Sequence, residues 1–157
     1  MARLIKYKTK ITGERQILLE KESCTNYPGM DLIITSPSDA ANIGVKCLGM
    51  HEHSEEHMYM LCLNTKNRVV GVFEVTRGTV NSSVVGVREI FQKVLLANAV
   101  HIILMHNHPS GDPEPSVEDF LITEKIMEAG DIIGVKLLDH LVIGDTFVSI
   151  KERIMAR

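Results

Sequence analysis

The sequence predicts an α/β fold in which helices pack on a mixed β-sheet. Segments with helical periodicity alternate with strand-like apolar segments along the chain, and two of the strand-like segments are close enough to form a hairpin. Apolar residues make up 45% and charged residues 24% of the 157 residues, which is typical of one globular domain with a sizeable core. Aromatic residues make up only 4%, so aliphatic residues and methionine must form most of that core.

The N-terminal region, residues 1–35, is predicted to contain strands and loop ahead of the main domain at residues 36–157. Residues 3–11 alternate apolar and basic side chains, which indicates a strand, and the lysines favour a place at the edge of the sheet. After a turn, residues 16–19 form a short strand, and the Ser, Asn, Pro and Gly residues of 21–35 indicate a loop. The exposed edge at the first strand would suit pairing with a peptide or a second chain.

The middle of the chain is predicted to form a helix, a hairpin and a second helix. Ser36 precedes a proline and starts a helix of about ten residues. Residues 57–63 are apolar on both faces, as in a central strand, and residues 68–75 return as the hairpin partner. Apolar side chains within residues 87–98 recur at helical spacing, which indicates a helix with one buried face.

A strand, a proline-rich loop and a long helix are predicted for the last third of the chain. Residues 100–105 form a short apolar strand, and residues 106–115 contain three prolines, which indicates a loop. A helix is expected over residues 116–129, with Gly130 at its C-terminal cap. The last two strands are expected near residues 134–143 and 146–151.

Composition and charge exclude several classes of protein. No apolar run approaches the roughly 20 residues that a membrane-spanning helix needs, and the N-terminus has no apolar stretch long enough for a signal peptide. The three cysteines match neither a disulfide framework nor a CxxC zinc site, which favours reduced thiols and a cytoplasmic location. With 17 basic and 20 acidic residues the net charge is −3, which does not favour a broad phosphate-binding surface.

The segment that carries chemistry runs from His106 to Asp119. His106 and His108 stand two residues apart at the end of an apolar strand, so both imidazoles can reach one point in space. Ser116 is a good helix N-cap, and Asp119 falls in the first turn of that helix. Asp119 heads an apolar stripe that comprises Ile122, Ile126, Ala129 and Ile133. A carboxylate on such a stripe needs a cation, and a divalent ion held by both histidines would provide it.

Two histidines and one carboxylate form a known catalytic zinc set that leaves one position open for water. Taken singly, the pieces have simpler explanations, because Ser-x-x-Asp is common as a capping box and strand histidines are more often packing residues. Their combination at the end of a strand and the start of an inward-facing helix favours the metal site. The His- and Glu-rich residues 51–57 are interpreted as a solvated linker whose side chains diverge, and His140 as a buried structural histidine.

The pattern His-x-His, seven residues, Ser, two residues, Asp is also the motif of the JAMM (MPN-type) metalloproteases. The run HNHPSGDPEPS, with LLDHLVIGD downstream and SPSDA, LNTKNRV and RGTVNSS upstream, resembles the RadC family of bacterial JAMM-like proteins over about residues 36–151. The resemblance implies an α/β sandwich similar to that of cytidine deaminases. It also implies one Zn²⁺ per chain on His106, His108 and Asp119, with Ser116 helping to hold the tetrahedral intermediate.

A JAMM site also needs a glutamate outside this segment, which accepts a proton from the attacking water. In the family this residue opens the strand after the first helix, and Glu56 occupies that place. Glu74 is the alternative, because an antiparallel return of the hairpin would bring it near the start of the first strand; its simpler interpretation is a surface charge. The resemblance favours Glu56 as the general base.

These inferences predict a zinc-dependent hydrolase, a metallopeptidase or isopeptidase, that acts on a peptide or protein substrate. The alternative is a DNA repair or recombination accessory protein with a structural or vestigial metal site, because the family is historically labelled DNA repair. A base deaminase is the third possibility, but its His/Cys/Cys or Cys₃ ligands and P-C-x-x-C motif are absent from the sequence.

The N-terminal residues and the charge bear on the nucleic-acid alternative. Typical RadC-like chains carry an N-terminal helical segment that resembles a helix-hairpin-helix DNA-binding unit, whereas residues 1–35 are expected to be strands and loop. Together with the net charge of −3, this predicts weak nucleic-acid binding. The oligomeric state stays open.

Overall fold

A seven-stranded mixed sheet forms the centre of the protein and confirms the predicted α/β class. The computed structural model describes residues 2–79 and 84–157, and its strands lie in the order β2-β1-β4-β3-β5-β6-β7. The strands are β1 (Ala2–Ile11), β2 (Ile17–Tyr27), β3 (His57–Leu63), β4 (Val69–Arg77), β5 (His101–Asn107), β6 (Lys136–Ile143) and β7 (Phe147–Ser149). The helices are α1 (Pro37–Lys46), α2 (Val87–Leu96), α3 (Val117–Ile133) and α4 (Ile150–Met155), with a short 3₁₀ helix at Met50–Glu52. Neighbouring strands run antiparallel except in the parallel pairs β1–β4 and β5–β6.

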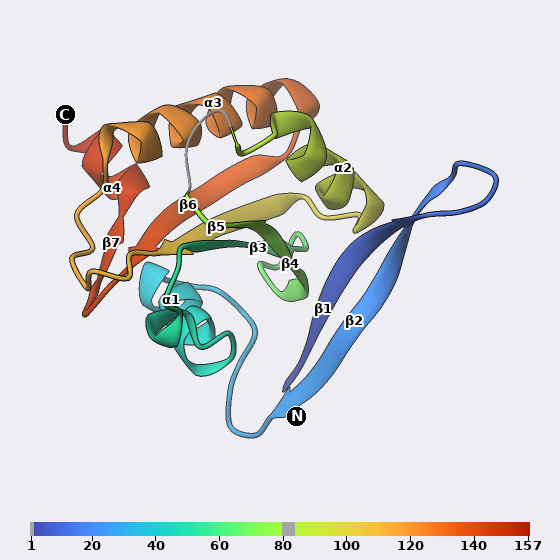
Figure 1. The fold of residues 1–157 in the computed structure, drawn as a ribbon, viewed down its shortest axis with the longest axis horizontal. Coiled ribbons are helices and arrows are strands. Elements are labelled where there is room, and N and C mark those ends of the chain that lie inside the picture. Colours follow the sequence, from blue (N-terminus) through green and yellow to red (C-terminus); the bar gives the residue numbers. More distant parts are fainter. Residues whose placement is uncertain (1, 80–83) are drawn as a thin grey trace.

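The sheet separates two hydrophobic layers. Figure 1 shows α1 on one face of the sheet and α2 and α3 on the other. Successive side chains of a strand point to opposite faces, so β3 contributes to both layers. Its residues divide between the layer at α1, with Tyr59, Leu61 and Leu63, and the layer at α2 and α3, with Met58, Met60 and Cys62. Every residue of β3 is buried, which confirms the predicted central strand.

The N-terminal hairpin differs from its prediction in two ways. β1 is not the edge strand, because it lies between β2 and β4, and the edge of the sheet belongs to β2. β2 also continues to Tyr27, through residues 21–27, whose polar composition predicts a loop. The lysines of β1 form ion pairs of 3.2 to 3.3 Å with glutamates of β2: Lys6 with Glu22, and Lys8 and Lys10 with Glu20. Such cross-strand pairs stabilise β2, which has little apolar patterning of its own.

The long helix α3 extends past its predicted end. It continues through Gly130 to Ile133, and Gly134 caps it with a positive φ of 87°. Gly130 serves packing instead of capping, because a Cβ atom there would clash with the backbone carbonyl oxygen of Val135. The buried face of α3 also differs from the predicted stripe, since Ile133 is 43% exposed whereas Thr123 and Gly130 are buried.

The chain ends in a short helix, not in a strand that reaches residue 151. β7 stops at Ser149, whose hydroxyl oxygen accepts a hydrogen bond from the backbone N–H of Glu152 and caps α4. The same hydroxyl donates to Asp139 Oδ1 on β6 at 2.8 Å. The change from strand to helix is therefore set by Ser149, whose hydroxyl donates to the sheet and accepts from the first turn of the helix.

The other elements lie close to their predicted positions. α1, β3, β4 and α2 match within a few residues, while β5 extends by two residues into the predicted loop and ends at Asn107. Part of the RGTVNSS stretch, residues 80–83, falls outside the described residues. Within the described ranges, none of the helices is long and apolar enough to cross a membrane.

Candidate metal centre

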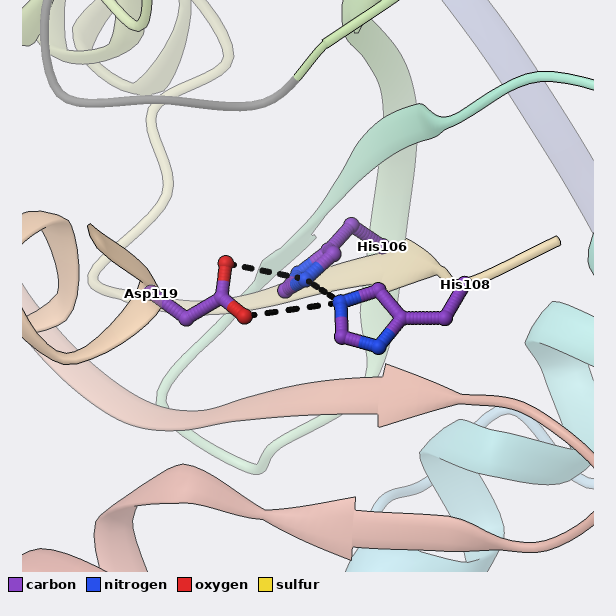
Figure 2. A group of neighbouring side chains, drawn as sticks. All are labelled: His106, His108 and Asp119. Carbon is purple, nitrogen blue, oxygen red and sulfur yellow. Dashed lines mark hydrogen bonds and ion pairs between the residues drawn. The ribbon is translucent and has the colours of Figure 1, made fainter. Parts of the chain in front are cut away.

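Two histidines mark the C-terminal end of β5. His106 lies inside the strand, between Met58 of β3 and Val142 of β6, and is completely buried. His108 follows the strand, but its backbone N–H still donates to the carbonyl oxygen of Ile143 at 2.8 Å, so β-type pairing continues through it. Because alternate side chains of a strand share a face, both imidazoles lie on the side of the sheet that carries α3 (Figure 2).

The first turn of α3 directs Asp119 toward the two histidines. Ser116 and Asp119 form a capping box: the Ser116 hydroxyl accepts from the Asp119 backbone N–H at 3.1 Å, and Asp119 Oδ2 accepts from the Ser116 backbone N–H at 2.8 Å. These reciprocal bonds hold the carboxylate at the start of the helix, where Asp119 is only 2% exposed. The capping role of Ser-x-x-Asp is therefore compatible with a carboxylate that faces the histidines.

The three side chains converge on one point, as Figure 2 shows. Asp119 Oδ1 lies 3.1 Å from His106 Nε2, Asp119 Oδ2 lies 3.4 Å from His108 Nε2, and the two Nε2 atoms are 3.2 Å apart. One potential ligand atom of each residue lies within 4.8 Å of the others. Burial by itself would raise the pKa of Asp119, but hydrogen bonds with His106 and His108 outweigh burial and hold that pKa well below its ordinary range.

The hydrogen bond at Nδ1 of His108 leaves Nε2 available to bind a metal ion. His108 Nδ1 lies 2.8 Å from the backbone carbonyl oxygen of Asp112, which can only accept, so in the neutral ring Nδ1 carries the proton and Nε2 a lone pair. When Nε2 is protonated it can donate to Asp119, and this hydrogen bond raises the pKa of His108 against the opposing effect of burial; the charge of Glu56 adds to the rise. Neutral imidazole nitrogens and a carboxylate oxygen are zinc ligands, so these residues fit a divalent metal ion.

Glu56 stands directly before β3, close to the two histidines. In the β3–β5 pairing Met58 opposes His106, and extending the same antiparallel register by two residues places Glu56 opposite His108. Directly opposed residues share a face of the sheet, so Glu56 belongs to the same side as the histidines. It is partly buried, and its carboxylate is one of the charges that raise the pKa of His108. Its assignment as general base stays a prediction.

Asn107 holds the backbone on both sides of Glu56, a contact that the sequence did not predict. Its Oδ1 accepts from the backbone N–H of His57 at 2.7 Å, and its Nδ2 donates to the backbone carbonyl of Glu55 at 3.0 Å. Asn107 is only 2% exposed. The sequence did contain a signal for this role. Asn107 stands between His106 and His108, so its side chain points to the opposite face of the sheet. In a central strand that face is buried too, and a buried amide needs hydrogen-bond partners.

Replacing Asn107 by leucine is expected to destabilise the protein by about 2–6 kcal/mol. The variant keeps the size of the side chain but leaves two buried backbone groups without partners, each of which costs about 1–3 kcal/mol. Urea unfolding measures the effect. The matched control is Asn42→Leu on the exposed side of α1, which should change the free energy of unfolding by no more than about 0.5 kcal/mol. Equal stability of the two variants would contradict the role of Asn107 in holding the backbone around Glu56.

Glu74, the alternative general base, lies on the opposite face of the sheet. It pairs with Tyr59 of β3, whose side chain belongs to the layer at α1. Its carboxylate accepts from His57 Nδ1 and from Arg77 Nε, both at 3.0 Å, and lies 3.5 Å from Lys6 Nζ. This cluster of partners accounts for its charge, and the structure does not bring Glu74 together with the metal centre.

The His- and Glu-rich residues 51–57 do not form a second centre among the described residues. The rings of His53 and His57 stack with their centroids 3.9 Å apart, and His53 Nε2 lies 3.5 Å from the hydroxyl of Tyr59. In the described parts of the chain, only one group of three or more His, Cys, Asp or Glu residues places its ligand atoms within 4.8 Å of one another, and that group consists of His106, His108 and Asp119.

Two further buried residues stand behind His106. His140 on β6 and Thr123 on α3 are completely buried, and burial holds the pKa of His140 well below its ordinary value. The sequence indicated His140 as a buried histidine but did not show its partners, which come from two other elements. For Thr123 the available signal was its position one helical turn after Asp119, on the same face of α3.

Fold and site together define a domain of the JAB/MPN type, with a His-x-His pair at a strand end and an aspartate at a helix start. The chain belongs to the RadC-like JAB domain family, whose model matches residues 34–155. The UPF0758 protein of Clostridium beijerinckii is 50% identical over 125 residues, which cover 78% of this chain and 53% of the relative. The UPF0758 protein YsxA of Bacillus subtilis is 48% identical over 122 residues (77% and 52%), and TTE0897 of Caldanaerobacter subterraneus is 38% identical over 154 residues (98% and 63%). The chain thus spans about half the length of the first two relatives.

Proposed function

We propose that this domain is a zinc-dependent hydrolase of peptide or isopeptide bonds, with a peptide or protein as its substrate. The observation that carries the proposal is the convergence of His106, His108 and Asp119 on one point, on the face of the sheet that Glu56 shares. Three protein ligands are the number that a catalytic zinc site uses, because the fourth position stays open. Membership of the JAB domain family supports the same chemistry.

Each residue of the site has a role in amide hydrolysis. His106, His108 and Asp119 would hold the ion, which when bound supplies Lewis acidity and a water with a pKa of about 7. Glu56 accepts a proton from the water that attacks the carbonyl carbon. It then delivers this proton to the nitrogen as the C–N bond breaks, so that an acid and an amine leave and the base is restored.

Ser116 is suited to stabilise the oxyanion that forms during the attack. Its hydroxyl oxygen accepts from the Asp119 backbone N–H at 3.1 Å, which orients the group and leaves its own O–H proton free to donate. Ser116 is exposed to solvent, so a substrate can reach it. A donor that is positioned before the reaction stabilises developing charge without reorganisation.

Cleavage of a peptide library tests the proposed function. We expect the zinc-loaded protein to cleave members of the library, and chelation followed by return of zinc to abolish and restore the cleavage. The control is Asp119→Asn, which retains an oxygen for the capping bond from Ser116 but lacks the negative charge. Cleavage at an equal rate by the chelated protein or by Asp119→Asn would contradict the proposal, and so would the absence of any cleavage by the zinc-loaded protein.

Nonspecific binding to DNA is expected to be weak. The net charge is −3, and the lysines of β1, which form the most basic strand, have carboxylate partners in Glu20, Glu22 and Glu74. At physiological salt we expect a Kd no tighter than the roughly micromolar range of nonspecific binding. Fluorescence anisotropy with labelled duplex DNA at several salt concentrations measures it. A Kd far below micromolar with a steep salt dependence would favour a role as a DNA repair accessory.

A further inference from the structure

A chain of buried hydrogen bonds connects His106 to α3 from the side away from the proposed metal. His106 Nδ1 lies 2.8 Å from His140 Nε2 on the neighbouring strand β6. His140 Nδ1 lies 2.6 Å from Thr123 Oγ1, and this hydroxyl lies 2.6 Å from the backbone carbonyl oxygen of Asp119. His106, Thr123 and His140 are all 0% exposed, so their polar atoms depend on one another for hydrogen bonds.

The direction of each bond follows from the chemistry of its end groups. A carbonyl oxygen can only accept, so the single hydroxyl proton of Thr123 must point to Asp119. Thr123 Oγ1 is then the acceptor for a proton on His140 Nδ1. With its proton on Nδ1, the neutral His140 ring carries a lone pair on Nε2, the atom that lies 2.8 Å from His106 Nδ1. His106 Nδ1 must therefore donate to His140.

We propose that His140 and Thr123 are positioning residues that fix the tautomer and the ring orientation of His106, so that His106 binds metal through Nε2. With Nδ1 as the donor, the neutral His106 ring has its lone pair on Nε2, the atom that lies 3.1 Å from Asp119 Oδ1. The hydrogen-bond directions are independent of the proposed function, whereas their consequence for metal binding rests on it.

The same chain of bonds couples two of the proposed ligands. Thr123 lies one helical turn after Asp119, so its hydroxyl returns to the backbone of the residue whose carboxylate faces the site. A shift of α3 would therefore move the Asp119 carboxylate and, through His140, release the ring of His106. Partners that orient metal ligands in this way typically account for about 10–100-fold in metal affinity.

Nitrogen NMR of the full chain with labelled histidine tests the hydrogen-bond directions. We expect His140 to carry its proton on Nδ1 and to have an unprotonated Nε2, in the metal-free and in the zinc-loaded protein alike. A neutral imidazole in water prefers the opposite tautomer, so the protein environment must impose this one. A His140 ring that is protonated on Nε2, or on both nitrogens near neutral pH, would overturn the proposal.

A matched pair of variants at Thr123 tests the consequence for metal binding. Thr123→Val keeps the shape of the side chain but removes the hydroxyl, and Thr123→Ser retains it. Competition with a chromophoric chelator should show zinc affinity about 10–100-fold weaker in the valine variant and unchanged in the serine variant. Equal affinity of the two variants would overturn the inference.

The NMR measurement keeps the two proposals separable. If Thr123→Val does not fold, the tautomer of His140 in the wild-type protein still decides the inference. Absence of zinc binding by the wild-type protein would remove the proposed function, while the hydrogen-bond directions would be decided by the metal-free spectrum.

Discussion

Replacing His106 or Asp119 by alanine is expected to remove stoichiometric zinc from the protein. Each variant deletes one of three ligands that meet within 4.8 Å, and no other His, Cys, Asp or Glu in the described parts of the chain joins this group to replace it. Loss of a partner that only orients a ligand typically costs about 10–100-fold in affinity, so loss of a ligand itself should cost at least about 100-fold. Dialysis should then strip the ion from the variants but not from the wild-type protein.

Elemental analysis after dialysis measures this effect, with about one zinc expected per wild-type chain. The matched control is His53→Ala, because His53 stacks on His57 and does not belong to the converging group. The variant Asp119→Asn removes the negative charge but keeps an oxygen that can accept from the Ser116 backbone N–H, so the helix cap is retained. A loss of zinc in this variant is therefore not caused by unfolding of the start of α3. Stoichiometric zinc in both alanine variants would show that the ion binds elsewhere.

The candidate ligands could be predicted from the sequence because each depends on local geometry. Two histidines at alternate positions of a strand must share a face, whatever the rest of the fold does. A serine and an aspartate three residues apart at a helix start form a capping box from local bonds alone, which fixes where the carboxylate points. Only the meeting of strand and helix needed the tertiary structure, and the part of the predicted stripe that is buried, Ile122 and Ile126, already indicated it.

The contacts behind and beside the ligands could not be predicted, because their partners are distant in the sequence. Asn107 holds residues that lie about 50 positions earlier, and His140 meets a strand that lies 34 positions earlier. The extension of β2 has a different cause: its residues have the polar composition of a loop, and only the pairing with β1, which places Glu22 beside Lys6, makes them a strand. Gly130 and Gly134 illustrate a further ambiguity, because both suit a helix cap and only packing against Val135 distinguishes them.

Glu56→Gln is expected to keep the zinc and to lose the hydrolytic activity by about 10²–10⁴-fold, the contribution of a general base. Glutamine has the size of glutamate but cannot accept and return a proton at neutral pH. Glu56 is not one of the three converging ligands, so metal content should be unaffected. Turnover of a cleavable peptide and zinc content, measured on the same preparation, separate the two effects.

Glu74→Gln is the matched control, and it should retain both zinc and activity. Glu74 carries the same charge on the same hairpin, but its carboxylate meets Lys6, His57 and Arg77 on the face of the sheet that carries α1. Its replacement weakens the ion pairs with Lys6 and Arg77, which are partly exposed and should contribute no more than about 1 kcal/mol each. The oxygen of a glutamine can still accept the hydrogen bond from His57 Nδ1. An inactive, zinc-loaded Glu74→Gln beside an active Glu56→Gln would reverse the assignment.

Asn107→Leu provides an independent check on how Glu56 acts. The amide of Asn107 fixes the peptide groups immediately before and after Glu56. If Glu56 must be held against the attacking water, loosening its backbone should lower the rate in the leucine variant while zinc stays bound, because a misplacement of about 1 Å can cost about 10²-fold. Full activity in Asn107→Leu together with a loss of activity in Glu56→Gln would show that the carboxylate is required but its fixed position is not.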